Sequence, residues 1–278
     1  MSRELIGTRA GITERHEKIV ALLRLHGALS VADLASRFEC SAATIRRDIQ
    51  ELEAQGEIRR FHGAVALDGT VVERPFRDKY ATHADKKKAI AMQLAHWIPD
   101  GVTVGLNGGT TATAVALQLM EFKRKITVVT NAVNIAHILS DGGTSVVVVG
   151  GALRPQNYET TGPMALSSLA NLHLDWAILG ANGVDKKFGI TATTEQEAAV
   201  GHAFAVQADR VVVAADSSKL GRTALFRMLA WEEMQYLASD HDAEAEMEEW
   251  GVKAVEPGVW ANRQGLMTAD WPMGDGQR

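Results

Sequence analysis

Four arginines lie in two adjacent pairs within the stretch SAATIRRDIQELEAQGEIRRFHGA, at residues 41–64. The first pair, Arg46 and Arg47, comes shortly after Ser41, a residue type that commonly caps the start of a helix. Guanidinium groups bind phosphates and the edge of guanine, so arginine near the start of an exposed helix is typical of DNA recognition. The alternative is an ordinary solvated helix on which Arg47 pairs with Glu51, one turn further along.

A glycine-rich segment, NGGTTATAVALQL at residues 107–119, has the composition of a phosphate-binding turn. Its glycines allow a ligand close to the backbone, its threonines offer hydroxyls, and the N–H groups that open the following helix favour an anion. The predicted ligand contacts here are Asn107, Gly108, Gly109, Thr110 and Thr111. The GxGxxG order of dinucleotide sites and the P-loop lysine are both missing, which argues against those two classes. A glycine-rich turn that only caps the helix is the alternative.

Polar residues also follow four other short apolar runs. These amides, hydroxyls and carboxylates, with one lysine, suit a hydroxylated and phosphorylated small molecule. We therefore add to the predicted ligand site Thr130, Asn131, Gly151, Asn182, Asp185, Asp216 and Lys219, together with Glu197 of the segment EQEAAV. Each of them, taken singly, is also compatible with a turn or a helix cap.

The first arginine pair needs a helix that presents it to solvent, and the apolar spacing predicts one over residues 42–55. On this helix Ile45, Ile49 and Leu52 share one face, which must pack against a core. The opposite face and its flanks are predicted to contact DNA through Ala43, Thr44, Arg46, Arg47 and Gln50, with Ser41 at the cap. Gly56 then ends the helix.

The surrounding elements form a recognisable set. Two short helices, over residues 14–25 and from Ser30 onwards, precede the arginine helix, and residues 57–67 alternate around a His-Gly turn that predicts a hairpin. The hairpin is predicted to contact DNA through Arg59, Arg60 and His62. Three helices and a hairpin predict a winged helix-turn-helix over residues 12–67. Cys40, in the turn, is expected to be a small buried residue rather than a redox switch.

The glycine-rich segment is expected to follow a strand of a β-sheet. β-branched runs at residues 102–106, 126–130, 145–149, 176–180 and 210–215 are mostly separated by helix-like segments. This pattern predicts an α/β fold with a mostly parallel open sheet, covered on both faces, in which ligands bind at the carboxyl ends of the strands. We expect a linker over 68–84, a helix near 85–97, an effector-binding and oligomerisation domain over 85–256, and a tail over 257–278.

Composition limits the function classes. The net charge is -5, with ten Lys and Arg against nine Asp and Glu in residues 1–63 and 19 against 25 in the remainder, so any DNA contact must be local. The start of the sequence lacks the apolar stretch of a secretory signal, and there is no long apolar run, which predicts a cytoplasmic protein without membrane contact. One cysteine and nine scattered histidines predict no disulfide, no metal site and no cofactor.

The stretch VADLASRFECSAATIRRDIQELEAQGEIRRFHGA resembles the DNA-binding signature of DeoR-type bacterial transcriptional regulators, and the polar clusters that follow resemble the sensor domain of the same family. This resemblance covers about residues 12–240. It implies a sensor fold similar to ribose-5-phosphate isomerase and a phosphorylated sugar or related metabolite as effector. Three departures stand out: HGA in place of HGGA, Asn107 where the family often has Asp, and Gly201 where it commonly has Lys.

The function that follows is a transcriptional regulator, a repressor of a sugar-metabolism operon that binds operator DNA as a homodimer or homotetramer and responds to a phosphorylated sugar. An alternative is a sugar-phosphate isomerase-like enzyme with an appended DNA-binding head. In the segment GANGVD, which corresponds to the acidic turn of the isomerases, Asn182 and Gly183 cannot act as a general base, and only Asp185 and Glu197 remain, so we expect no catalysis. A nucleoid-type DNA-binding protein without effector is a third possibility.

Overall fold

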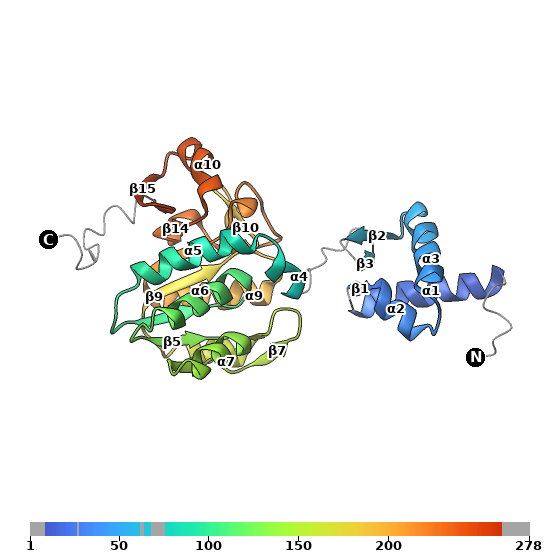
Figure 1. The fold of residues 1–278 in the computed structure, drawn as a ribbon, viewed down its shortest axis with the longest axis horizontal. Coiled ribbons are helices and arrows are strands. Elements are labelled where there is room, and N and C mark those ends of the chain that lie inside the picture. Colours follow the sequence, from blue (N-terminus) through green and yellow to red (C-terminus); the bar gives the residue numbers. More distant parts are fainter. Residues whose placement is uncertain (1–8, 27, 62–63, 68–75, 263–278) are drawn as a thin grey trace. The chain divides into compact units, whose positions relative to one another are not determined.

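The computed structural model describes residues 9–26, 28–61, 64–67 and 76–262 (Figure 1). The chain divides into two compact units, Met1–Glu73 and Arg74–Arg278, which are called the head and the sheet domain below.

The head contains three helices and a small antiparallel sheet. In chain order its elements are α1 (Arg9–His26), β1 (Ala28–Ser30), α2 (Val31–Arg37), α3 (Ala42–Ala54), β2 (Ile58–Phe61) and β3 (Ala64–Leu67). The strands pair in the order β1-β3-β2, which confirms the predicted winged helix-turn-helix and adds a strand that the sequence analysis did not anticipate. Ser30 caps α2 and Ser41 caps α3, each by accepting a hydrogen bond from a backbone N–H, as predicted.

The sheet domain is built on an eight-stranded sheet in the order β15-β16-β14-β12-β9-β4-β5-β6. Its strands are β4 (Thr103–Leu106), β5 (Thr127–Thr130), β6 (Ser145–Val148), β9 (Leu174–Gly180), β12 (Ala208–Ala214), β14 (Tyr236–Ala238), β15 (Lys253–Glu256) and β16 (Val259–Ala261). All five predicted strands are present. They and β14 run parallel; at one edge β16 pairs antiparallel with β14, and β15 pairs antiparallel with β16.

Helices cover both faces of this sheet. On one face α5 (Ala84–Trp97), α6 (Thr110–Glu121) and α7 (Val133–Asp141) bury Ile90, Val115 and Leu139 against the strands, and α5 lies beside α6 (Figure 1). On the other face α8 (Pro163–Leu169) and α9 (Glu195–Val206) bury Leu169 and Phe204. Because both faces are covered, the strands are apolar throughout rather than alternating, which is the pattern seen in the sequence.

Two predicted segments differ from the elements that the structure describes. Residues 68–84 were expected to be a linker, yet α4 (Phe76–Ala81) lies within them, with the rings of Phe76 and Tyr80 stacked 5.8 Å apart. A helix of six residues is too short to show a period in the sequence. The expected tail from 257 onwards begins too early, because β16 pairs with β14 inside the main sheet.

Smaller elements connect the strands of the main sheet. They are the hairpin of β7 (Ala152–Arg154) and β8 (Glu159–Thr161), the sheet of β10 (Gly183–Asp185), β11 (Gly189–Ala192) and β13 (Phe226–Leu229), the 3-10 turns η2 (Ser217–Lys219), η3 (Trp231–Glu233) and η4 (His241–Ala243), and α10 (Glu244–Glu249). No helix in the described part of the chain combines the length and apolar character needed to cross a membrane.

Candidate functional site

Helix α3 presents the first arginine pair to solvent. Ile45, Ile49 and Leu52 are buried in the core of the head, which confirms the predicted orientation of the helix. The predicted DNA contacts on the other side are all accessible: Ser41, Ala43, Arg46, Arg47 and Gln50 are exposed and Thr44 is half-buried. Ser41 Oγ accepts a hydrogen bond from the Thr44 N–H at 3.1 Å, which orders the first turn of α3.

The alternative role of Arg47, an ion pair with Glu51, is not found. Among the described residues of the head, neither Arg46 nor Arg47 forms an ion pair, and the carboxylate of Glu51 lies 3.9 Å from His16 instead. The guanidinium group of Arg47 is therefore available to an outside partner, as a base-reading or phosphate-binding side chain requires.

An ion pair between a half-buried arginine and a buried aspartate fixes α3 against α1, and it was not predicted from the sequence. Arg15 donates two hydrogen bonds to Asp48, at 2.6 and 2.7 Å, and His16 Nε2 lies 3.3 Å from the same carboxylate. The hydrogen bonds to Asp48 raise the pKa of Arg15. Asp48 lies directly before Ile49, inside the apolar stripe of α3, and that position was the available signal for a buried and paired carboxylate.

Of the predicted DNA contacts on the hairpin, only the side chain of Arg60 lies within the described residues. Arg60 pairs with Glu53 of α3, with a Nε to Oε2 distance of 2.8 Å, so this arginine ties β2 to the helix as well as facing solvent. Arg59 belongs to β2, but its side chain lies outside the described residues, as does all of His62.

The second candidate site lies at the carboxyl edge of the parallel strands. The glycine-rich segment follows β4 there and leads directly into α6, with Gly109 at φ 103 as the residue before the helix. A positive φ favours glycine, and the first N–H groups of α6 point toward this turn. We call the turn formed by residues 108–111 the cradle. Its position is the one predicted for a phosphate-binding turn.

Asn107 stands at the cradle but is committed to the backbone. Its Nδ2 donates to the Gly180 carbonyl at 3.1 Å, and its Oδ1 accepts from the Gly180 N–H at 2.8 Å. An aspartate could not make the first of these hydrogen bonds, so asparagine at this position bridges the ends of β4 and β9.

Asn131, directly after β5, holds the hairpin strand β8 in place. The Asn131 side chain donates to the Thr160 carbonyl at 2.9 Å, and Thr160 N–H donates to the Asn131 carbonyl at 2.7 Å. Thr130 Oγ1 accepts from the Ala132 N–H. Asn131 Oδ1 is buried without a hydrogen-bond partner among the described residues, which is energetically costly.

The hairpin brings a carboxylate to the cradle. Glu159 opens β8, is only 6% exposed, and extends over Gly108: a side-chain carbon on Gly108 would overlap the Glu159 Cγ and carboxylate. Glu159 was not predicted from the sequence, because no local pattern links it to a residue of a different strand.

Glu197 anchors the hairpin to α9. Its carboxylate accepts from Asn157 at 2.5 Å and lies 3.3 Å from Arg154, whose guanidinium group donates to Thr194. Glu197 also closes the capping box of α9. The predicted ligand contact therefore has a structural role in this state. Gly151, at the start of the same hairpin, has φ 149 and packs against the Thr161 backbone.

Other predicted ligand residues have local partners. Asp185 accepts hydrogen bonds from the N–H groups of Lys187 and Phe188 and so orders the turn after β10. Asn182 accepts from the Thr193 N–H. Asp216, at the end of β12, is buried and accepts from Ser218, while Lys219 lies half-buried in η2.

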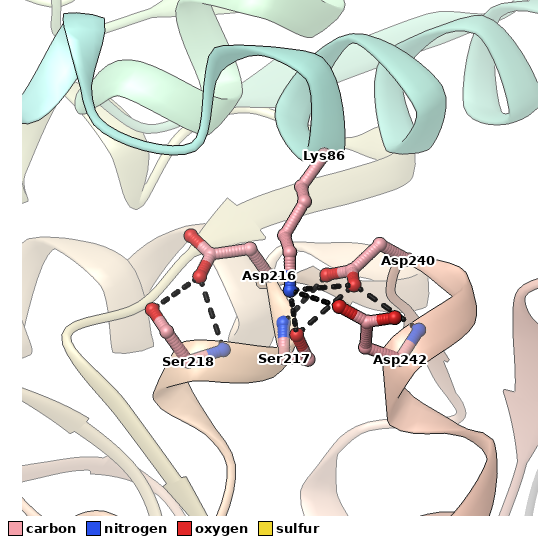
Figure 2. Close-up of polar contacts among 6 residues, drawn as sticks. All are labelled: Lys86, Asp216, Ser217, Ser218, Asp240 and Asp242. Carbon is pink, nitrogen blue, oxygen red and sulfur yellow. Dashed lines mark hydrogen bonds and ion pairs between the residues drawn. The ribbon is translucent and has the colours of Figure 1, made fainter.

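A lysine that the sequence analysis did not single out joins α5 to the carboxyl edge (Figure 2). Lys86 Nζ lies 2.6 Å from Ser217 Oγ, 2.6 Å from Asp242 and 3.2 Å from Asp240. Ser217 in turn donates its N–H and its hydroxyl to Asp240. We call these four residues the Lys86 cluster. It connects the first turn of α5 with the ends of β12 and β14.

One group of possible metal ligands occurs elsewhere in the described chain. His173, Asp175 and Asp209 lie at the amino ends of β9 and β12, opposite the cradle, and one ligand atom of each lies within 4.8 Å of the others. His173 and Asp209 are exposed, whereas Asp175 already accepts a hydrogen bond from the Thr103 N–H. Exposed pairs of this kind are common surface interactions.

The two units define a class of protein: a helix-turn-helix head that exposes an arginine-bearing helix, joined to a parallel-sheet domain with a glycine-rich cradle. A family model described as the DeoR-like helix-turn-helix domain matches residues 15–71, and one described as the DeoR C terminal sensor domain matches residues 82–241. The chain belongs to the DeoR family of transcriptional regulators. It is a DNA-binding regulator, and this family is not an enzyme family.

Curated relatives match along most of their length. The chain is 34% identical over 217 residues to the glycerol-3-phosphate regulon repressor of Escherichia coli (strain K12), covering 78% of this chain and 86% of that protein. It is 32% identical over 240 residues to a putative aga operon transcriptional repressor of Escherichia coli O157:H7, with 85% and 89% covered. With the transcriptional repressor AccR of Agrobacterium fabrum it shares 34% over 230 residues.

Solved structures align over part of the chain. Ribose 5-phosphate isomerase A from Methanocaldococcus jannaschii covers 50% of this chain and 55% of its own, at 18% identity and a TM-score of 0.39. The delta subunit of eIF2B from Chaetomium thermophilum covers 51% of each chain, at 17% identity and a TM-score of 0.40.

Proposed function

We propose that this regulator is a repressor of a sugar-metabolism operon, and that a phosphorylated sugar or a related phosphorylated metabolite bound at the cradle controls its affinity for operator DNA. The observation that carries the proposal is the cradle itself, where glycines, threonine hydroxyls and the start of α6 meet at the carboxyl edge of the sheet. Relatives named as repressors of the glycerol-3-phosphate regulon and of the aga operon support the same kind of control.

DNA recognition is assigned to the exposed face of α3. Arg47 and Gln50 are long, exposed side chains with the donors needed at base edges, and the N-terminus of α3 with Ser41 is suited to a backbone phosphate. Because operator DNA lies in the cytoplasm of a bacterial cell, we propose that the protein acts there.

The chain is also proposed to act as a homodimer or homotetramer. One short head reads few base pairs, and two heads on repeated half-sites raise affinity and specificity together. The edge strand β6 and its neighbours support the sheet domain as the assembly surface, because they expose Val147, Val148, Leu153 and Met164. Val147 and Val148 belong to the edge strand itself, and exposed apolar side chains on an edge strand are typical of a surface that another protein covers.

The proposal is tested by fluorescence anisotropy with a labelled fragment of the promoter upstream of the protein's own gene, at fixed salt and across a panel of sugar phosphates that includes glycerol 3-phosphate. We expect specific binding that at least one panel member weakens, since an effector acts through its differential affinity for two states. Arg47→Ala should lower specific affinity by about tenfold or more, from the loss of roughly 1–3 kcal/mol of base or phosphate contact.

Lys253→Ala provides a charge-matched control, because Lys253 is exposed on β15 in the sheet domain. Equal loss of affinity in both variants would show that Arg47 contributes only general charge. Binding that no phosphorylated compound alters would contradict the effector part of the proposal.

A further inference from the structure

Glu159 places a carboxylate where an anionic ligand would bind. The residue is nearly fully buried, and its side chain covers Gly108 so closely that only glycine fits beneath it. The glycine that would allow a ligand near the backbone at this point instead accommodates a side chain of the protein itself. The N-terminus of α6, immediately after Gly109, favours negative charge in this position.

The position of Glu159 is set by backbone pairing. Val133 N–H donates to the Tyr158 carbonyl at 3.0 Å, and Thr160 N–H donates to the Asn131 carbonyl at 2.7 Å, so the residues on both sides of Glu159 are held across the end of β5. The Glu159 N–H donates to Asn157 at 3.4 Å. Because the backbone is held on both sides of Glu159 and its side chain is buried over Gly108, the carboxylate is part of the cradle rather than a passing surface contact.

We propose that Glu159 is the specificity-determining residue of the cradle: its carboxylate occupies the phosphate position in the ligand-free state, and a phosphorylated effector binds only by displacing it. This inference rests on the proposed effector site. Two negative charges cannot share one small, partly dehydrated turn, so binding of phosphate and retention of Glu159 exclude each other. Glu159 therefore raises the effector concentration needed to occupy the site.

Displacement of Glu159 would also affect the contact between the β7–β8 hairpin and α4. Tyr158, the residue before Glu159, has φ 61, and its ring meets the ring of Phe76 edge-on at 5.3 Å. Phe76 begins α4, the first described element of the chain after the head. A ligand that moves Glu159 thus acts on the hairpin segment that contacts α4, and the energy needed for the movement comes from the ligand's own contacts.

The test compares the full-length protein with Glu159→Gln and with Glu195→Gln, by isothermal titration calorimetry with inorganic phosphate and with glycerol 3-phosphate. Glu195 is exposed on the first turn of α9, so its variant makes the same change in net charge away from the cradle. We expect Glu159→Gln to bind inorganic phosphate about tenfold more tightly than the wild type, because a neutral amide no longer repels the anion. Glu195→Gln should match the wild type.

The possible results distinguish a failure of the role proposed for Glu159 from a failure of the proposed effector site. Tighter phosphate binding by Glu159→Gln alone supports the inference. If the wild type binds glycerol 3-phosphate and Glu159→Gln binds either probe equally or less tightly, Glu159 is not a competitor of phosphate and the inference fails while the effector site stands. If neither protein binds either probe, but an unphosphorylated sugar weakens operator binding, both are overturned. If Glu159→Gln does not fold, Glu159→Asp, which shortens the side chain by one methylene, must show the same tightening to a smaller extent.

Discussion

Arg47 and Asp48 are neighbours in α3 and have opposite surroundings. Arg47 faces solvent on the side predicted to contact DNA, whereas Asp48 is buried and accepts two hydrogen bonds from Arg15. A rotation of the helix by one residue would exchange these environments, burying an unpaired guanidinium group. The Arg15–Asp48 pair therefore fixes which face of α3 is available to DNA, although it touches no DNA itself.

At this scale we predict that Asp48→Ala destabilises the head by about 1–3 kcal/mol, since it removes the buried carboxylate that accepts two hydrogen bonds from Arg15. The measurement is differential scanning calorimetry of the full chain, in which the transition of the head should move to lower temperature while that of the sheet domain stays. Glu51→Ala removes an exposed carboxylate from the same helix and should change stability by less than about 0.5 kcal/mol. Equal melting of all three proteins would show that the buried pair adds nothing.

The Lys86 cluster acts on the scale of elements, because it ties the start of α5 to the loops after β12 and β14. The hydrogen bond to Asp242 is the main reason that the pKa of Lys86 is raised; burial opposes this, and Asp240 adds to it. Burial raises the pKa of Asp240, but hydrogen bonds from Ser217 and Lys86 outweigh it, so that the net pKa lies below the ordinary 3.8. Both shifts favour the charged forms in the folded state.

The directions of these two pKa shifts define the pH range in which the Lys86 cluster stabilises the fold. A lowered Asp240 pKa gives stability that is present above about pH 4 and is lost as the pH falls through the folded-state value, and the raised Lys86 pKa gives stability that is lost only above about pH 10. We predict that Lys86→Met costs about 1 kcal/mol at pH 7 and that the difference from wild type shrinks below about pH 4. Urea unfolding at several pH values measures this, with Lys88→Met, an exposed neighbour on α5, as the control. A difference that does not change with pH would remove Asp240 from the explanation.

An element could be predicted from the sequence when the interactions that form it are local along the chain. The period of Ile45, Ile49 and Leu52 is local, and so are the apolar runs of the five parallel strands, which is why α3 and the core of the sheet were found. The placement of Glu159 over Gly108 depends on β8 crossing the end of β5, a contact between distant parts of the chain. The Lys86 cluster likewise joins residues more than 130 positions apart.

At the scale of the whole molecule, the exposed apolar side chains of β6 and β7 predict assembly. Val147→Lys combined with Leu153→Glu places charges on this surface without altering net charge, and we expect the variant to have the mass of one 30.0 kDa chain. Light scattering coupled to size exclusion measures the mass, and anisotropy should show weaker operator binding. Leu225→Lys changes an even more exposed apolar residue next to β13 and should assemble as wild type. An unchanged mass of the double variant would place the interface elsewhere.

Cys40, the single cysteine of the sequence, lies half-buried in the turn between α2 and α3, next to the helix that is proposed to contact DNA. Burial raises the pKa of its thiol, so attachment of a spin label is slow at neutral pH and proceeds better under alkaline conditions. In an assembly of identical chains, each head would then carry one nitroxide at the same place. The electron-electron dipolar coupling between them would report the separation of the heads directly, and its change on adding a phosphorylated effector would turn the regulation of this repressor into a measured distance.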